Sequence, residues 1–114
     1  MNISFDSIGQ TAVTFCNNSS APAKAGDCVC MSANAEVSAA GANARFFGVA
    51  LSADDSFAVV QTAGVVSLPF SGTAPSVGWV KLAANGENGV VQDNANGSEF
   101  LVLDVSDSTI TFVL

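Results

Sequence analysis

The side chains that could do chemistry include three cysteines but no histidine. Without imidazole, the chain has no His metal ligand and no Ser-His or Cys-His pair to activate a nucleophile. Cys28 and Cys30 flank Val29 in an expected strand, so their side chains share one face about 7 Å apart, which is awkward for a mutual disulfide. Together with Cys16 they make an odd number, which argues against a disulfide framework. We expect buried free thiols in a protein made in a reducing cytoplasm. A metal or redox site is the alternative, and zinc would need Asp or Glu as a fourth ligand.

Carboxylates are the other potentially reactive group. Adjacent Asp54 and Asp55 could form an acid/base pair, but neighbouring loop residues usually point apart, and Asp in a turn caps the backbone. The run Asp93–Glu99 resembles a calcium loop, yet Ala95 stands where the EF-hand pattern needs Asp or Asn, and no Glu follows at the required spacing. A hairpin turn is the preferred interpretation. We expect no catalytic residue, no cofactor and no metal ion. The carboxylates are Asp6, Asp27, Glu36, Asp54, Asp55, Glu87, Asp93, Glu99, Asp104 and Asp107.

Charge and hydropathy exclude further classes of function. Only Lys24, Arg45 and Lys81 are basic, and the net charge is −7 at pH 7. Such a chain repels a phosphate backbone, so nucleic-acid binding is not expected. No apolar run approaches the roughly 20 residues that span a bilayer. The start, Met1–Asp6, lacks the basic and apolar regions of a signal peptide. We therefore expect no membrane contact, and a chain that stays where it is made until it is assembled.

The elements that must position these residues are short apolar segments separated by Gly, Asn, Asp and Ser. Turn residues recur about every 8–12 positions, which is typical of an all-β sandwich or barrel. Asn85-Gly86 and Asn96-Gly97 could supply the positive φ angles of tight type I′ hairpins. A chain of 114 residues fits one domain with a radius of gyration of roughly 13 Å. The expected strands are Thr11–Phe15, Asp27–Met31, Phe46–Leu51, Phe57–Thr62, Val65–Phe70, Val77–Leu82, Gly89–Gln92, Glu99–Val105 and Thr109–Leu114.

Two segments have alternative interpretations. Val77–Leu82 follows Pro75 with some helical spacing, but Gly78 and β-branched residues favour a strand. In that strand either Trp79 or Val80 must face inward. A place in the core is the default for Trp79 and an interface role the alternative. The Ala-rich stretch Ala33–Ala44 is interpreted as a loop, with a helical turn as the alternative. We find no convincing repeat of 20–50 residues.

Residues 1–10 differ from the domain expected over residues 11–114. Ile3 and Phe5 alternate with polar residues, so an extended segment would present one apolar edge. It could be an ordinary first strand. It could also be an arm that adds a strand to a neighbouring sheet, with Ile3 and Phe5 as anchors.

From Ala25 onward the sequence resembles the small capsid decoration, or cement, proteins of tailed bacteriophages. The matching elements cover roughly four-fifths of the chain. They are Ala25-Gly26-Asp27, Gly48-Val49-Ala50-Leu51, Gly64-Val65-Val66-Ser67-Leu68-Pro69, Val77-Gly78-Trp79-Val80 with Asn85-Gly86, and the final strand Ser108–Leu114. The three cysteines and the segment Cys16–Ala25 depart from the pattern, which leaves the assembly state open.

This resemblance implies a β-barrel-like or β-tulip domain without enzymatic activity. Proteins of this family bind the outer surface of a phage capsid, commonly as trimers, and strengthen the shell. The implied partner is thus the major capsid protein of a phage head, on the exterior of the virion. An N-terminal arm often makes the shell contact, which would give Ile3, Phe5 and Ile8 their role. Trp79 is the candidate contact residue within the domain.

Three other functions stay open. A carbohydrate- or ligand-binding β module on a fibre or cell surface usually exposes several aromatic rings, and this chain has one Trp and no Tyr. A pilin-like or tail-tube subunit would polymerise alone at high concentration. A small hydrolase is opposed by the missing His and nucleophile motif.

Overall fold

The computed structural model describes residues 11–114. These residues form ten β-strands joined by loops and turns, and they contain no helix. The expected all-β fold is confirmed. The strands are β1 Thr11–Asn17, β2 Cys28–Ala33, β3 Glu36–Ala39, β4 Gly48–Ala53, β5 Phe57–Ala63, β6 Val65–Ser71, β7 Gly78–Ala84, β8 Val90–Gln92, β9 Ser98–Val105 and β10 Thr109–Val113.

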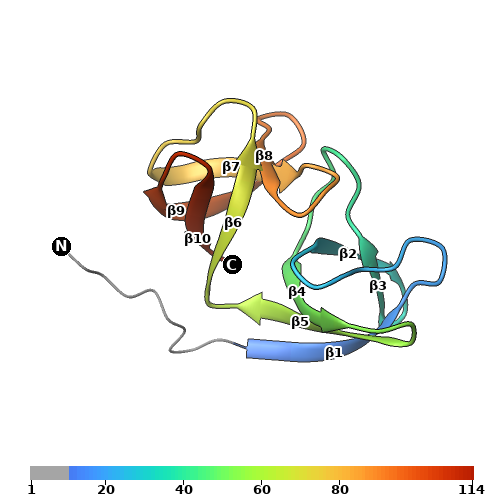
Figure 1. Cartoon of the computed structure of the whole chain (residues 1–114). Helices are drawn as coiled ribbons and strands as arrows, with labels where there is room; N and C mark the ends of the chain where they lie inside the picture. Colours follow the sequence, from blue (N-terminus) through green and yellow to red (C-terminus); the bar gives the residue numbers. More distant parts are fainter. Residues whose placement is uncertain (1–10) are drawn as a thin grey trace.

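These strands close into two five-stranded barrels that follow one another along the chain (Figure 1). The first barrel has the strand order β1-β3-β2-β4-β5, and the second has the order β10-β6-β8-β7-β9. Gly64 alone separates β5 from β6. The two barrels lie side by side, with β5 and β1 along the lower edge in Figure 1 and β6–β10 above them.

The second barrel repeats the strand pairing of the first. In each barrel the first and third strands are parallel, and every other pair is antiparallel. Ala50 pairs with Val60, and Val102 pairs with Phe112, so equivalent residues of these strands lie 52 positions apart. The fold therefore contains a structural repeat, whose spacing is slightly longer than the 20–50 residues considered for a sequence repeat. The spacing differs by a residue between strands, since Gly48 pairs with Val29 as Phe100 pairs with Val80, so the repeat is hard to see in the sequence.

The two barrels have different cores. The first encloses small side chains, namely Ala23, Val29, Val37, Ala50, Ala58 and Val60. The second forms a larger cluster with aromatic rings, to which residues before and within β4 contribute. This cluster contains Cys28, Ala40, Phe46, Val49, Val66, Leu68, Val80, Leu82, Ala84, Val90, Phe100, Val102, Ile110 and Phe112.

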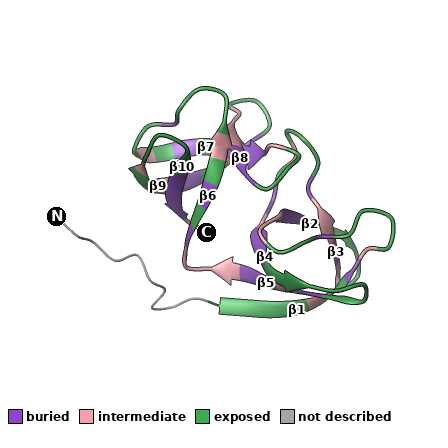
Figure 2. Ribbon diagram, in the orientation of Figure 1, coloured by how far each residue is buried: buried purple, intermediate pink, exposed green. Residues whose placement is uncertain are grey.

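Adjacent phenylalanines join the barrels at this point. The ring of Phe46 stacks on Phe100, with 5.1 Å between centroids, and meets Phe112 edge-on at 6.2 Å. Phe47 packs toward the first barrel, where its ring meets Phe15 of β1 edge-on with 5.8 Å between centroids. The cluster is the core of the second barrel, and Cys28, Phe46 and Val49 of the first half of the chain pack into it. Figure 2 shows buried stretches, in purple, on strands of both barrels. The Cα radius of gyration is 13.4 Å, close to the size expected for one domain.

Two local expectations are wrong. The stretch Ala33–Ala44 was expected to be a loop, but it contains β3, which pairs with β1 and β2. The side chains of β3 show little hydrophobic alternation, because Val37, which is fully buried, is its only large apolar residue. The Asn-Gly turns also differ. Asn85 opens a longer loop closed by its own N–H to the Gly89 carbonyl, and Asn96-Gly97 joins β8 to β9, which do not pair with each other.

Candidate functional site

The most distinctive surface feature is a row of four apolar side chains across the outer face of the second barrel. Trp79 pairs with Leu101, Leu101 with Val113, and Val113 with Val65, so four neighbouring strands contribute one residue each. Trp79 is 68% exposed, and the other three are half-buried. We call these four residues the Trp79 row.

Strand alternation places the indole outside. Val80 faces inward opposite Phe100 and is buried, so Trp79 must face outward. The default expectation of a core position for Trp79 is therefore wrong, and its alternative as a surface contact residue remains. Val77, just before β7, is also exposed, at 66%.

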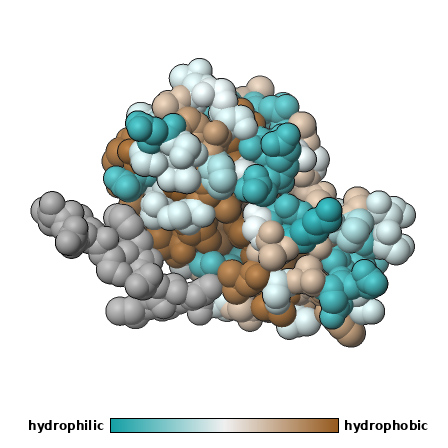
Figure 3. Space-filling model, viewed as in Figure 1, coloured by the Kyte–Doolittle hydropathy of each residue, from teal (hydrophilic) through white to brown (hydrophobic). Residues whose placement is uncertain are grey.

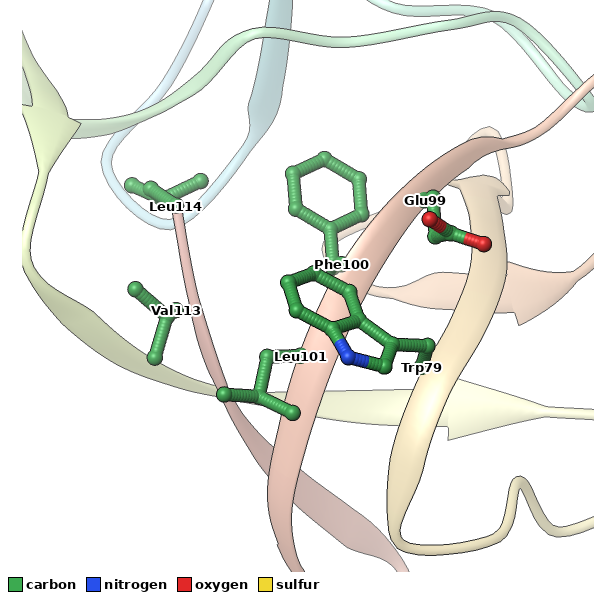
Figure 4. Close-up of a pocket in the computed structure, with 6 residues that line it drawn as sticks. All are labelled: Trp79, Glu99, Phe100, Leu101, Val113 and Leu114. Atoms are coloured by element: carbon green, nitrogen blue, oxygen red, sulfur yellow. The ribbon is translucent and has the colours of Figure 1, made fainter.

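A shallow cavity of about 270 Å³ accompanies the row. Its lining residues are Trp79, Glu99, Phe100, Leu101, Val113 and Leu114. Figure 4 shows the Trp79 indole beside Leu101, with Val113 and Leu114 on one side and Glu99 on the other. In Figure 3 hydrophobic surface gathers on the second barrel near the C-terminal end of the chain.

Charge enters this surface only at its rim. Lys81 and Glu99 are paired in register, two residues along each strand from Trp79 and Leu101. Side chains two apart on a strand share a face, so this pair of opposite charges borders the Trp79 row. An apolar surface with a charged border suits contact with another protein, because exposed aromatic and aliphatic side chains gain free energy when they leave water.

All three cysteines are free thiols, as expected. Cys28 is buried between the barrels, and its Sγ lies 3.6 Å from the carbonyl oxygen of Gly89. Burial, with a smaller contribution from the charge of Asp27, raises the pKa of the Cys28 thiol to about 12. Cys30 is half-buried, and Cys16 is exposed, so the expectation of burial is wrong for Cys16. Cys16 lies on the outer side of β1 because the alternate residues Phe15 and Asn17 face inward.

The carboxylates hold turns. Asp54 Oδ1 accepts the N–H groups of Ser56 and Phe57, and these bonds lower the pKa of Asp54. Asp93 accepts the N–H groups of Asn96 and Ala95 in the loop that was compared with a calcium site, and its pKa is lowered chiefly by the Asn96 N–H. Within residues 11–114, no three His, Cys, Asp or Glu side chains gather as a metal site.

Glu36 is another carboxylate held by neighbouring side chains. Glu36 Oε1 accepts bonds from the Ser32 hydroxyl and the Asn18 amide, which lower the pKa of Glu36. Ile3, Phe5 and Ile8 lie outside the described residues. Sequence reasoning found Trp79 but missed its three neighbours in the row. The alternation within each strand could have placed them on one face, but only the pairing register brings them together.

The fold and surface define a class: a tandem β-barrel protein with an exposed apolar face. The described residues form no helix suited to crossing a membrane. Comparisons of the chain with models of protein families, with curated proteins and with solved structures give no match.

Proposed function

We propose that this chain is a non-enzymatic structural protein that decorates the outer surface of a tailed-phage capsid and stabilises the shell. The proposal rests on the resemblance of Ala25–Leu114 to capsid decoration proteins. The observation that supports it most is the Trp79 row, because an apolar face on rigid paired strands provides a ready protein contact.

A decoration protein needs many modest contacts rather than one deep pocket. Each copy contributes a small interface free energy. Simultaneous contacts to several neighbours raise the overall avidity above the affinity of any one contact. The Trp79 row provides such a contact on the domain. The N-terminal residues Ile3, Phe5 and Ile8 provide the second contact in this proposal, directed at the major capsid protein.

Cosedimentation with empty phage heads tests the proposal. Full-length protein should pellet with heads at a fixed number of copies per shell and raise the temperature at which the shells open. A chain lacking residues 1–10 should fold, as judged by Trp79 fluorescence and circular dichroism, and fail to bind. Full occupancy by the truncated chain would refute the role of the N-terminal segment. Absence of binding by the intact chain to a panel of heads would refute the proposed function.

One observation favours a second candidate, a carbohydrate-binding module. The exposed Trp79 ring and the Glu99 carboxylate line the same cavity, where the ring can stack on a sugar and the carboxylate can accept hydrogen bonds from its hydroxyl groups. A glycan array with intrinsic fluorescence readout separates the two proposals. Saturable quenching of the lone Trp by a glycan, without binding to heads, would favour the module.

A further inference from the structure

The described part of the chain begins beside one end of the Trp79 row. Thr11, its first residue, pairs with Ala63 at the end of β5. Gly64 alone separates Ala63 from Val65, which is the member of the row on β6. Residues 1–10 are therefore joined to the domain next to the Val65 end of the row.

The cavity and the row both lie within reach of this point. Leu114, which lines the cavity, donates its N–H to the Gly64 carbonyl oxygen at 2.9 Å. From Val65 the row crosses three strand spacings to Trp79. At about 4.8 Å per spacing it is roughly 15 Å long. Because ten extended residues span about 33 Å, the segment 1–10 is long enough to cover the whole row from where it joins β1.

The sequence of this segment suits the chemistry of the row. Its large aliphatic and aromatic residues are Ile3, Phe5 and Ile8, and Asp6 is its one charged side chain. An extended chain advances about 3.3 Å per residue, so Ile8 can reach about 10 Å from Thr11 and Phe5 about 20 Å. The first distance extends to the near end of the row and the second toward the indole. These side chains gain free energy when they leave water together with the row.

Two features favour this segment over a second copy of the chain as the cover. A short tether gives an effective concentration on the order of millimolar, which a separate molecule does not have. A second copy must also approach against repulsion, since each molecule carries a net charge of −7.

We propose that residues 1–10 lie across the Trp79 row of their own chain, with Phe5 in the cavity beside the indole. This contact belongs to the free protein and does not depend on the proposed function. If the row and the segment both bind a capsid, as proposed above, they must first separate.

Two full-length variants with the same added charge test the proposal. Phe5→Asp places a carboxylate where the cavity is apolar, whereas Ser4→Asp adds it on the opposite edge of the extended segment. Trp79 is the single tryptophan, so its emission maximum and its quenching by acrylamide report the cover directly. In Phe5→Asp the ratio of docked to free segment should fall about tenfold or more, so the emission shifts to the red and quenching rises. Ser4→Asp should match the wild type.

Two-dimensional amide NMR spectra of the same proteins locate the contact. The single indole N–H gives one signal, and Phe5→Asp should shift it together with the amide signals of Leu101 and Val113. The amide signals of Met31 and Phe57, two exposed apolar residues of the first barrel, should not move. Far-ultraviolet circular dichroism should be equal in all three proteins, because both substitutions lie outside the ten strands.

Several outcomes would overturn the proposal. Equal quenching of Trp79 in the wild type and in Phe5→Asp would mean that the row is open to water. Protection of Trp79 that is lost on dilution, with dimers in sedimentation velocity, would mean that a second copy covers the row. An equal response to Ser4→Asp would mean that charge, and not the apolar edge, controls the emission. Signal shifts confined to the first barrel would place the segment there.

Discussion

The two barrels pair their strands in the same order and directions around different cores. The first is filled by alanine and valine, whereas the second contains Phe100 and Phe112 and receives Phe46 from the first half of the chain. The core of the second barrel is thus completed by the first half of the chain, so we expect the two halves to unfold as one unit.

One bulge and the turn that follows it recur in both barrels, although the core residues differ. The pairing shifts by one residue past Leu51 in β4 and past Leu103 in β9. The next turn is closed in both barrels by the same backbone bonds, from Asp54 N–H to the Phe57 carbonyl and from Ser106 N–H to the Thr109 carbonyl. A β-bulge bends a strand and fixes its register. The shared bulge and turn therefore keep the same local geometry at this point of both barrels, while the volumes of the two cores differ.

Phe46→Ala should have the largest effect, because it removes the ring that links the barrels. Loss of a buried Phe costs about 3–5 kcal/mol in the free energy of unfolding. Urea denaturation followed by Trp79 fluorescence should show one transition at lower urea, and the Cys28 thiol should become reactive toward iodoacetamide. Phe57→Ala is the matched control at an exposed position and should change stability by less than about 0.5 kcal/mol. A loss below about 1 kcal/mol for Phe46→Ala would mean that the barrels are independent.

Much of this fold could be predicted from the sequence, because apolar alternation and turn residues are local signals. Nine of the ten strands coincide with expected segments. The exception is β3, whose side chains are small and whose partners are distant. Closure into two barrels also escaped prediction. Closure depends on the parallel pairs β1–β3 and β6–β8. In each pair the two strands are separated along the sequence by another strand.

The contact face shows the same limit. The alternation within one strand predicts that Trp79 and Val80 face opposite sides of the sheet, but it does not predict which of them faces the core. The strand register determines which residue faces the core. Val80 lies opposite Phe100, so the side chains of both residues point into the barrel. Likewise, the burial of Cys28 follows from the second barrel's position, which no spacing within β2 encodes.

Asn17→Ala tests a buried polar residue at a position that is apolar in the second barrel. Asn17 pairs with Val37 as Phe70 pairs with Val90. The Asn17 amide bonds the carbonyl oxygens of Ala23 and Asp54 and accepts the Ala23 N–H. Removing it leaves these backbone groups without partners, so the free energy of unfolding should fall by about 2–3 kcal/mol in urea denaturation.

The exposed Asn88→Ala serves as the control for this change and should be nearly neutral. Asn17→Ala with stability equal to that of Asn88→Ala would show that water replaces the amide at no cost. The polar position would then be incidental to the first barrel.

Gly48→Ala tests why the first core is small. Gly48 pairs with Val29 as Phe100 pairs with Val80, yet a Cβ at Gly48 would lie 2.6 Å from the Gln61 carbonyl oxygen and from Val60 Cγ1. The backbone must shift to admit even a methyl group, so we expect a loss of about 1–3 kcal/mol in thermal or urea unfolding. Gly41→Ala, where a Cβ meets nothing within 4 Å, should be neutral or slightly stabilising. Equal effects of the two changes would contradict this account.

Asp54→Ser should have the smallest effect and isolates a difference in charge between equivalent turns. Asp54 caps the turn after β4 with a carboxylate, while Ser106 caps the turn after β9, where its hydroxyl oxygen accepts the Thr109 N–H at 3.2 Å. Since the folded-state pKa of Asp54 lies below its ordinary value, the ionised form stabilises the fold. This contribution is complete above the unfolded-state pKa and is lost as the pH falls through the folded-state pKa.

The stability difference between the wild type and Asp54→Ser should therefore be present at neutral pH and shrink toward strongly acidic pH. Thermal unfolding across that range measures it, with Asp55→Ser as a control that removes the adjacent carboxylate and keeps both bonds to Asp54. A difference that stays constant with pH would mean that the serine hydroxyl and the carboxylate cap the turn equally well. The charge of the first barrel's turn would then have no energetic role.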